Sequence, residues 1–276
     1  MLYTHIPDIS CFYSDSIGDN LLLPTAHFEY EMILVTSGKA SAIVNHKTYQ
    51  LSAGSLIVIS RLERHNFLIE EEPYCRYVIS ISSDLILSYI KNAELISIFI
   101  QRPQSFSHVL KLSEETFDSV LPLFQEMTGE YTAQQDFYTA KSAALFTAIL
   151  IDLYRAHRES FPMRGHSTMA TAVLNAQRYV NDHFQRKLTL QEIADANFIS
   201  HHALSLGFKE MVGITFKEYL LLFRITEAKK LLVTTDLSIS QIAERVGYVN
   251  VNNFLKIFKE REHITPLQYR KQLNIW

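Results

Sequence analysis

The sequence predicts a multidomain α+β protein. An antiparallel β-barrel with flanking helices comes first, followed by an all-α domain of two helix-turn-helix units joined by a long helix. Short apolar runs separated by turn residues fill residues 21–82. After residue 82, apolar residues recur every three or four positions, which is the period of an amphipathic helix. The last hundred residues contain one pattern twice, which indicates a duplicated helical unit.

The front segment carries the turn signals of an antiparallel sandwich or barrel. One run ends at Gly38, the next bends at Asn45-His46, another opens at Gly54, and the last bends at Glu72-Pro73. Strands of about five to eight residues joined by tight turns are typical of such folds. Residues 1–110 are therefore predicted to form the barrel.

Two amphipathic helices are expected next, over Glu114 to Tyr131 and Asp136 to Arg158. Their apolar faces are predicted from three- and four-residue spacing, with Phe117, Val120, Leu121 and Phe124 on the first and Ala144, Ile151 and Tyr154 on the second. Residues 111–158 are assigned to a helical dimerisation element, although these faces could equally pack on the barrel alone. The polar segment 159–170 is assigned to a linker, and 171–276 to the C-terminal domain.

Charge is distributed unevenly along the chain, whose net charge is -3. Residues 1–170 carry 12 Lys+Arg and 19 Asp+Glu, or -7, while residues 171–276 carry 14 and 10, or +4. This asymmetry is expected if only the C-terminal part meets phosphate. Cys11 and Cys75 lack disulfide-framework or metal-finger spacing. No signal peptide or membrane-length apolar run is evident, so a cytoplasmic protein without a membrane partner is expected.

The repeat has an offset of 49 residues for its first pair and 50 for the others, so one copy has a turn longer by one residue. Its members are Ile193-Ala194, Phe208-Lys209-Glu210, Ile214-Thr215 and Tyr219, which recur as Ile242-Ala243, Phe258-Lys259-Glu260, Ile264-Thr265 and Tyr269. Helix starts are predicted at Thr189 (with Glu192 in a capping box), Ser200 and Asp236. Gly247 is suited to the turn of the second unit.

The second helix of each unit has the side chains of a DNA recognition helix. Asparagine can pair with two edges of adenine, and lysine can reach guanine or phosphate. The candidate DNA contacts are His201, His202 and Ser205 in the first unit, Asn250, Asn252, Asn253 and Lys256 in the second, and Lys209, Arg224 and Lys259 for phosphate. The alternative is a helical protein-interaction scaffold on which these polar residues are only solvated.

With this pattern, residues from about 172 to 274 resemble the DNA-binding domain of the AraC/XylS family of bacterial transcription regulators. The resemblance implies two helix-turn-helix units that enter adjacent major-groove segments about one turn, ~34 Å, apart. The chain departs from the family pattern at Leu206, at Gly207 in mid-helix and at Asn197-Phe198 in the first turn. We therefore expect the first unit to read DNA less strongly than the second, or to need a partner or effector for order.

Residues 25–65 resemble the cupin-like barrel found ahead of this domain. In cupin enzymes, two histidines spaced by one residue, a glutamate and a distant histidine bind a metal. Here Thr25 stands at the first histidine position, and His27, Glu31 and His65 remain. These four residues are predicted to line the effector site. A two-His, one-carboxylate metal site with open positions is the competing interpretation. We favour a barrel without a metal or cofactor, because one ligand is replaced.

The sequence thus indicates a transcription regulator rather than an enzyme. The expected partners are double-stranded DNA, a small-molecule effector and a second copy of the chain, with RNA polymerase as a further candidate. Two alternatives stay open, which are a metal-dependent cupin enzyme fused to a DNA-binding domain and a regulator whose barrel serves only assembly. Neither a nucleophile elbow nor a phosphate-binding glycine loop is present.

Overall fold

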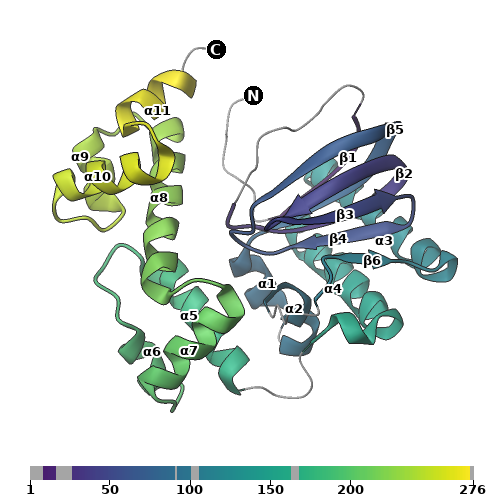
Figure 1. The fold of residues 1–276 in the computed structure, drawn as a ribbon, viewed down its shortest axis with the longest axis horizontal. Helices are drawn as coiled ribbons and strands as arrows, with labels where there is room; N and C mark the ends of the chain where they lie inside the picture. Colours follow the sequence, from purple (N-terminus) through teal and green to yellow (C-terminus); the bar gives the residue numbers. More distant parts are fainter. Residues whose placement is uncertain (1–8, 17–26, 91, 101–105, 163–167, 274–276) are drawn as a thin grey trace. The chain divides into compact units, whose positions relative to one another are not determined.

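The computed structural model describes residues 9–16, 27–90, 92–100, 106–162 and 168–273. The chain divides into two compact units, one within residues 7–167 and the other within 168–276. An antiparallel sheet with helices makes up the first unit and helices alone make up the second, as Figure 1 shows. The predicted fold class is therefore confirmed. The boundary of the linker at 159–170 stays a prediction, as does the dimerisation role of 111–158.

Within the described part of the first unit, six antiparallel strands form one sheet. In chain order they are β1 (Ile9–Ser16), β2 (Tyr30–Val44), β3 (Lys47–Ser52), β4 (Ser55–Ile59), β5 (His65–Ile81) and β6 (Val109–Lys111). The order across the sheet is β1-β5-β2-β4-β6, and β3 pairs with β2. Two predicted strand ends are wrong. β2 runs on through Gly38, and β5 runs on through a cis Glu72-Pro73 bond.

The sheet curls because β2 bends at its middle. Its register against β5 shifts between Val35 and Ala40, and Gly38 lies in this bulge with a φ of 76°. A side chain at Gly38 would collide with the backbone of β5, since an added Cβ would lie 2.5 Å from the Glu71 carbonyl oxygen. Residues from both halves of β2 line the same apolar core. The bend therefore brings the two ends of β2 around one interior.

Helices pack against this sheet and against one another. They are α1 (Ser83–Tyr89), α2 (Ala93–Ile100), α3 (Glu114–Ala133), α4 (Tyr138–Ala156) and the 3-10 turn η1 (Arg158–Ser160). α3 lies against β1 and α4 (Figure 1). The predicted face of α3 is right at Val120 and Phe124, which are fully buried. The predicted face of α4 is only partly right, because Ile151 and Tyr154 are half-buried and Ala144 is exposed. The buried hydrophobic residues of α4 are Ala143, Phe146, Ile149, Leu150 and Leu153.

The described residues of the second unit form seven helices. They are α5 (Thr168–His183), α6 (Leu190–Ala196), α7 (His201–Val212), α8 (Phe216–Thr234), α9 (Ile239–Arg245), α10 (Val251–Glu262) and α11 (Pro266–Leu273). The long α8 joins one group, α5 to α7, to a second group, α9 to α11 (Figure 1). Repeated residues make the same contacts in each group. The rings of Phe208 and Tyr219 are 5.4 Å apart, and those of Phe258 and Tyr269 are 5.8 Å apart.

The helix starts agree in part with the predicted caps. Ser200 caps α7 by accepting from the Ala203 amide. Asp236 is not the cap of α9, because Ser238 takes that position and forms a capping box with Gln241. Thr189 holds the cap position of α6 but makes no capping bond, and its hydroxyl instead bonds the Glu192 carboxylate.

The extra residue of the second copy lies in the turn between its two helices. Gly247 has a φ of 89° there, and Phe198 takes the corresponding left-handed position in the first copy, with a φ of 55°. One residue, Ile199, separates Phe198 from the cap of α7, whereas two separate Gly247 from the cap of α10. In the described parts of the chain, no helix is long and apolar enough to cross a membrane.

Candidate nucleic-acid interface and ligand site

The α10 helix presents a polar face while its apolar face holds it in place. Phe254 and Phe258 are fully buried in the core of this group. Asn252, Asn253 and Lys256 are exposed. Asn250 differs from its neighbours because its side-chain oxygen caps the helix, 2.8 Å from the Asn252 amide and 3.2 Å from the Asn253 amide. Its role is therefore to start the helix, and the whole amide groups of the other two asparagines remain on the surface.

The α7 helix repeats this arrangement with different side chains. Leu204 and Phe208 are fully buried, and His201, His202 and Ser205 are exposed. Gly207, which looked unfavourable in mid-helix, is explained by packing within this unit. A Cβ at Gly207 would lie 2.4 Å from the Met169 sulfur of α5, so a larger residue there would require the Met169 side chain to shift. The first unit is thus tightly packed despite its glycine.

Arg224 has a structural position that the sequence did not indicate. Its Nε donates to the Phe184 carbonyl at 2.8 Å, and its Nη2 donates to the Arg186 carbonyl at 2.8 Å. Its guanidinium also lies over the Tyr248 ring, 5.5 Å from the centroid. These contacts tie the middle of α8 to the segment that follows α5, so we do not carry Arg224 forward as a phosphate contact. Lys209 and Lys259 are exposed on α7 and α10.

In the sheet-containing unit, His27, Glu31 and His65 lie close together although they are far apart in the sequence. His27 precedes β2, Glu31 is the second residue of β2, and His65 begins β5 opposite Val44 at the other end of β2. A straight strand would separate Glu31 from Val44 by about 43 Å. Because β2 bends, the Nε2 atoms of both histidines lie 3.4 Å from the same Glu31 carboxylate oxygen. Thr25 lies outside the described residues.

Backbone carbonyls orient both imidazoles. His27 Nδ1 lies 3.1 Å from the Glu29 carbonyl oxygen, and His65 Nδ1 lies 2.9 Å from the Glu63 carbonyl oxygen. A carbonyl only accepts hydrogen bonds, so each Nδ1 carries a proton. In a neutral ring the Nε2 atom then offers its lone pair, and both Nε2 atoms point to Glu31.

Burial and charge act in opposite directions at this site. Burial lowers the pKa of His27, but the hydrogen bond and charge of Glu31 outweigh it and raise that pKa above its ordinary value. Burial also lowers the pKa of His65, and there it outweighs Glu31. Burial raises the pKa of Glu31, but the two histidines and Arg76 together lower it. The same carboxylate therefore has different net effects on the two histidines, since the pKa of His27 is raised and that of His65 is lowered.

A second group of hydrogen-bonded polar side chains adjoins this cluster. The sequence analysis did not predict it. Glu63 Oε1 lies 3.0 Å from His108 Nε2, and His108 Nδ1 lies 2.8 Å from the Tyr49 hydroxyl. The Glu63 backbone carbonyl orients His65, so the two clusters share this residue. His108 stands alone in the sequence before a three-residue strand, and no spacing could have indicated its partners.

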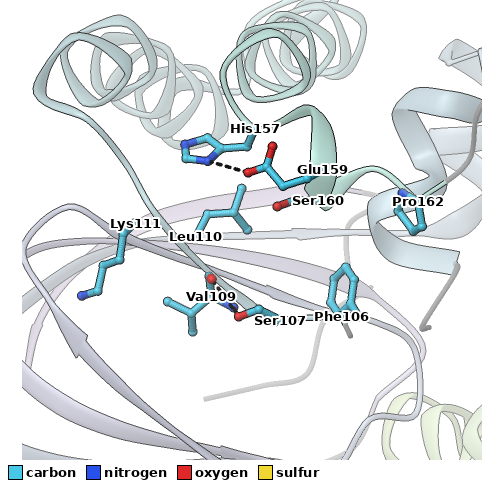
Figure 2. A pocket seen from close by; sticks show the side chains of 9 residues that line it. All are labelled: Phe106, Ser107, Val109, Leu110, Lys111, His157, Glu159, Ser160 and Pro162. Atoms are coloured by element: carbon cyan, nitrogen blue, oxygen red, sulfur yellow. Dashed lines mark hydrogen bonds and ion pairs between the residues drawn. The ribbon is translucent and has the colours of Figure 1, made fainter. Parts of the chain in front are cut away.

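A pocket of about 280 Å³ opens between β6 and the end of α4, as Figure 2 shows. Phe106 forms part of its wall and also contacts the His108 ring edge-on, with centroids 5.3 Å apart. His157 and Glu159 lie beside each other on one wall of it, with His157 Nδ1 3.8 Å from the Glu159 carboxylate. Its lining is Phe106, Ser107, Val109, Leu110, Lys111, His157, Glu159, Ser160 and Pro162, which excludes the three residues of the His27–Glu31–His65 cluster.

The cluster has a donor set that fits a divalent transition metal. One ligand atom from each of the three residues lies within 4.8 Å of the others. Two donors, each ~2.1 Å from a tetrahedral ion, are ~3.4 Å apart, which matches both histidine-to-carboxylate distances. Metal-bound histidines also usually donate their other ring N–H to a carbonyl, as both do here. The same geometry equally suits hydrogen bonding to a small polar molecule.

Comparison with known proteins gives matches in both units. Residues 7–150 match the model of an AraC-like ligand binding domain, and residues 193–272 match that of a helix-turn-helix domain. The lactose operon transcription activator of Staphylococcus xylosus is 25% identical over 271 residues, which cover 94% of this chain and 91% of that protein. The HTH-type transcriptional activator RhaR of Enterobacter sp. (strain 638) is 23% identical over 259 residues, 93% and 90% of the two chains.

Other matches are shorter or show the fold alone. YtdP, an uncharacterized HTH-type transcriptional regulator of Bacillus subtilis (strain 168), is 40% identical over 98 residues. This chain covers 13% of YtdP and 48% of YisR, a second such regulator from the same strain. The structure of ToxT from Vibrio cholerae has a TM-score of 0.55 at 17% identity and covers 96% of this chain and 98% of that one. That solved structure therefore has a similar fold.

Proposed function

The chain belongs to the AraC family of transcription regulators, and on that premise we propose that it binds specific DNA under the control of a small molecule. The observation that carries the proposal is the duplication of one unit around matching aromatic cores, each with an exposed polar face on its second helix. Two such helices on one rigid connector can enter successive major-groove segments.

Base reading is assigned to the exposed residues of α7 and α10. Asn252 and Asn253 can each pair with adenine, and Lys256 can reach guanine. His201, His202 and Ser205 take the corresponding part in the first unit. Lys209 and Lys259, together with the helix N-termini, would hold the phosphates and set the register.

The small molecule is assigned to the His27–Glu31–His65 cluster. Its half-buried carboxylate and oriented imidazoles offer both acceptors and donors to a polar ligand beside the apolar core of the sheet. Such a ligand acts only by binding one arrangement of the protein more tightly than another. A homodimer, formed through α3 and α4, would double the DNA contacts, with RNA polymerase as a further partner in the cytoplasm.

Paired substitutions test the DNA assignment on a fragment selected from genomic DNA. Asn252→Ala should weaken binding at least about fivefold, since a good base contact is worth about 1–3 kcal/mol. His202→Ala should cost less, because the first unit is expected to contribute less. Fluorescence anisotropy against the selected fragment and a scrambled one measures both. Unchanged affinity in both variants would contradict base reading by these helices, and equal losses would contradict the weaker first unit.

Metal-dependent catalysis in the barrel is the second candidate, favoured by three ligand atoms that lie within 4.8 Å of one another. His27, Glu31 and His65 would hold the ion, which would supply Lewis-acid chemistry at its open position. Metal analysis of protein purified without chelator separates the candidates. A stoichiometric transition metal that is lost on His27→Ala/His65→Ala would support this second function, and metal-free protein that still responds to a metabolite in thermal-shift assays would support the first.

A further inference from the structure

Leu206 is an apolar side chain on an otherwise polar recognition surface. The exposed residues of α7 are His201, His202, Ser205, Leu206, Lys209 and Glu210. Leu206 has 54% of its surface exposed, although Leu204 on the same helix is fully buried. One helical turn separates it from His202 on one side, and nearly one turn separates it from Lys209 on the other. Leu206 therefore lies next to His202, at one edge of the face assigned to DNA.

The internal repeat identifies the residue that corresponds to Leu206 in the second helix-turn-helix unit. The fifty-residue offset that relates Phe208 to Phe258 relates Leu206 to Lys256. Lys256 is also strongly exposed, with 74% of its side chain accessible. The two units therefore present the same surface position, once with a cation and once with an aliphatic group.

An aliphatic group can recognise only one feature of the major groove. Base edges there offer hydrogen-bond donors and acceptors, which leucine cannot use, and the 5-methyl group of thymine, which it can contact. On the proposed function above, we infer that Leu206 is a specificity-determining residue that reads a thymine methyl group in the block of the operator bound by the first unit. The second unit reads the equivalent position through the Lys256 ammonium group instead.

Removing the methyl group tests this inference directly. Each thymine of a selected fragment is replaced in turn by deoxyuridine, and affinity is measured by fluorescence anisotropy. At one thymine, wild-type protein should lose about fourfold in affinity, the value of one buried methyl-sized group. Leu206→Ala protein should bind both versions equally. Leu267→Ala is the matched control, since Leu267 is 51% exposed but lies on α11, and it should keep the wild-type response.

The possible results are distinguishable. If wild-type protein still prefers the selected fragment over scrambled DNA but binds every deoxyuridine version as tightly as its thymine version, the inference about Leu206 is overturned. The proposed function then still stands. A methyl effect that persists in Leu206→Ala would also overturn that inference. Equal affinity for the selected and scrambled fragments would overturn the proposed function as well. Circular dichroism checks that the variants fold, and Leu206→Lys should move the selected base at this position from thymine towards guanine.

Discussion

Gly247→Ala should be among the most damaging single-atom additions in the helical unit. The backbone at Gly247 has a φ of 89°, where a residue with a side chain costs about 1–2 kcal/mol. The added Cβ would lie 2.7 Å from the Gln185 carbonyl oxygen, and 2.8 Å from both the Phe184 carbonyl oxygen and Arg224 Nη2. Two of these atoms are backbone, so side-chain rotation cannot relieve the overlap, which adds about 1–3 kcal/mol. The expected loss in unfolding free energy is about 2–5 kcal/mol.

Gly213→Ala separates the two contributions. Gly213 has a φ of 84°, but an added Cβ would meet nothing within 4 Å, so only the conformational cost of about 1–2 kcal/mol applies. Thermal unfolding followed by far-ultraviolet circular dichroism measures both variants. In a domain of this size each 1 kcal/mol shifts the midpoint by about 4–8 °C, which predicts a clearly larger shift for Gly247→Ala. Equal shifts would refute the packing of this turn against α5 and Arg224.

Three further outcomes are expected. Ser238→Ala should destabilise the helical unit by about 1 kcal/mol in urea unfolding, because it removes the capping box, whereas Asp236→Ala should have little effect. Burial lowers the pKa of His27 but Glu31 outweighs it, so the stability that this pair adds is fully present below the ordinary histidine pKa of about 6.5 and is lost as pH rises through the raised value. The pKa of Glu31 is lowered from its ordinary value of 4.5, so its charge is present above that pH. Glu31→Gln should therefore lower the melting temperature most between about pH 4.5 and 6.5, and a pH-independent loss would count against the pair. Lys259→Ala should weaken binding to all DNA sequences similarly and reduce the salt dependence of binding by about one unit of slope, and a change in sequence preference instead would contradict a phosphate contact.

Local signals in the sequence predicted the helical unit well. The fifty-residue repeat located both recognition helices, because the same buried aromatic residues recur in each copy. Ser200 was correctly predicted as the cap of α7, because a serine side chain readily accepts from the free backbone N–H groups at a helix start. Asp236 was misassigned because Ser238, two residues later, is an equally good cap and has Gln241 at the spacing of a capping box.

Contacts between distant segments could not be predicted in this way. Gly38 looked like the end of a strand, but it lies in a bulge at which β2 bends. His108 and Glu63 are 45 residues apart, and only the folded sheet brings them together. Arg224 resembled a phosphate contact because a basic residue on an amphipathic helix looks the same whether it meets DNA or a backbone carbonyl. The position of Thr25, outside the described residues, stays a prediction together with its role at the ligand site.

The most direct test of the account is selection of genomic fragments by the purified protein at near-physiological salt, where non-specific binding is suppressed. We predict enrichment of sites with two short blocks about ten base pairs apart, one for each helix-turn-helix unit. Selection repeated with cell extract shows whether an effector is needed for the first block. Absence of any enriched site, with and without extract, would contradict the central claim that the duplicated helical unit reads specific DNA.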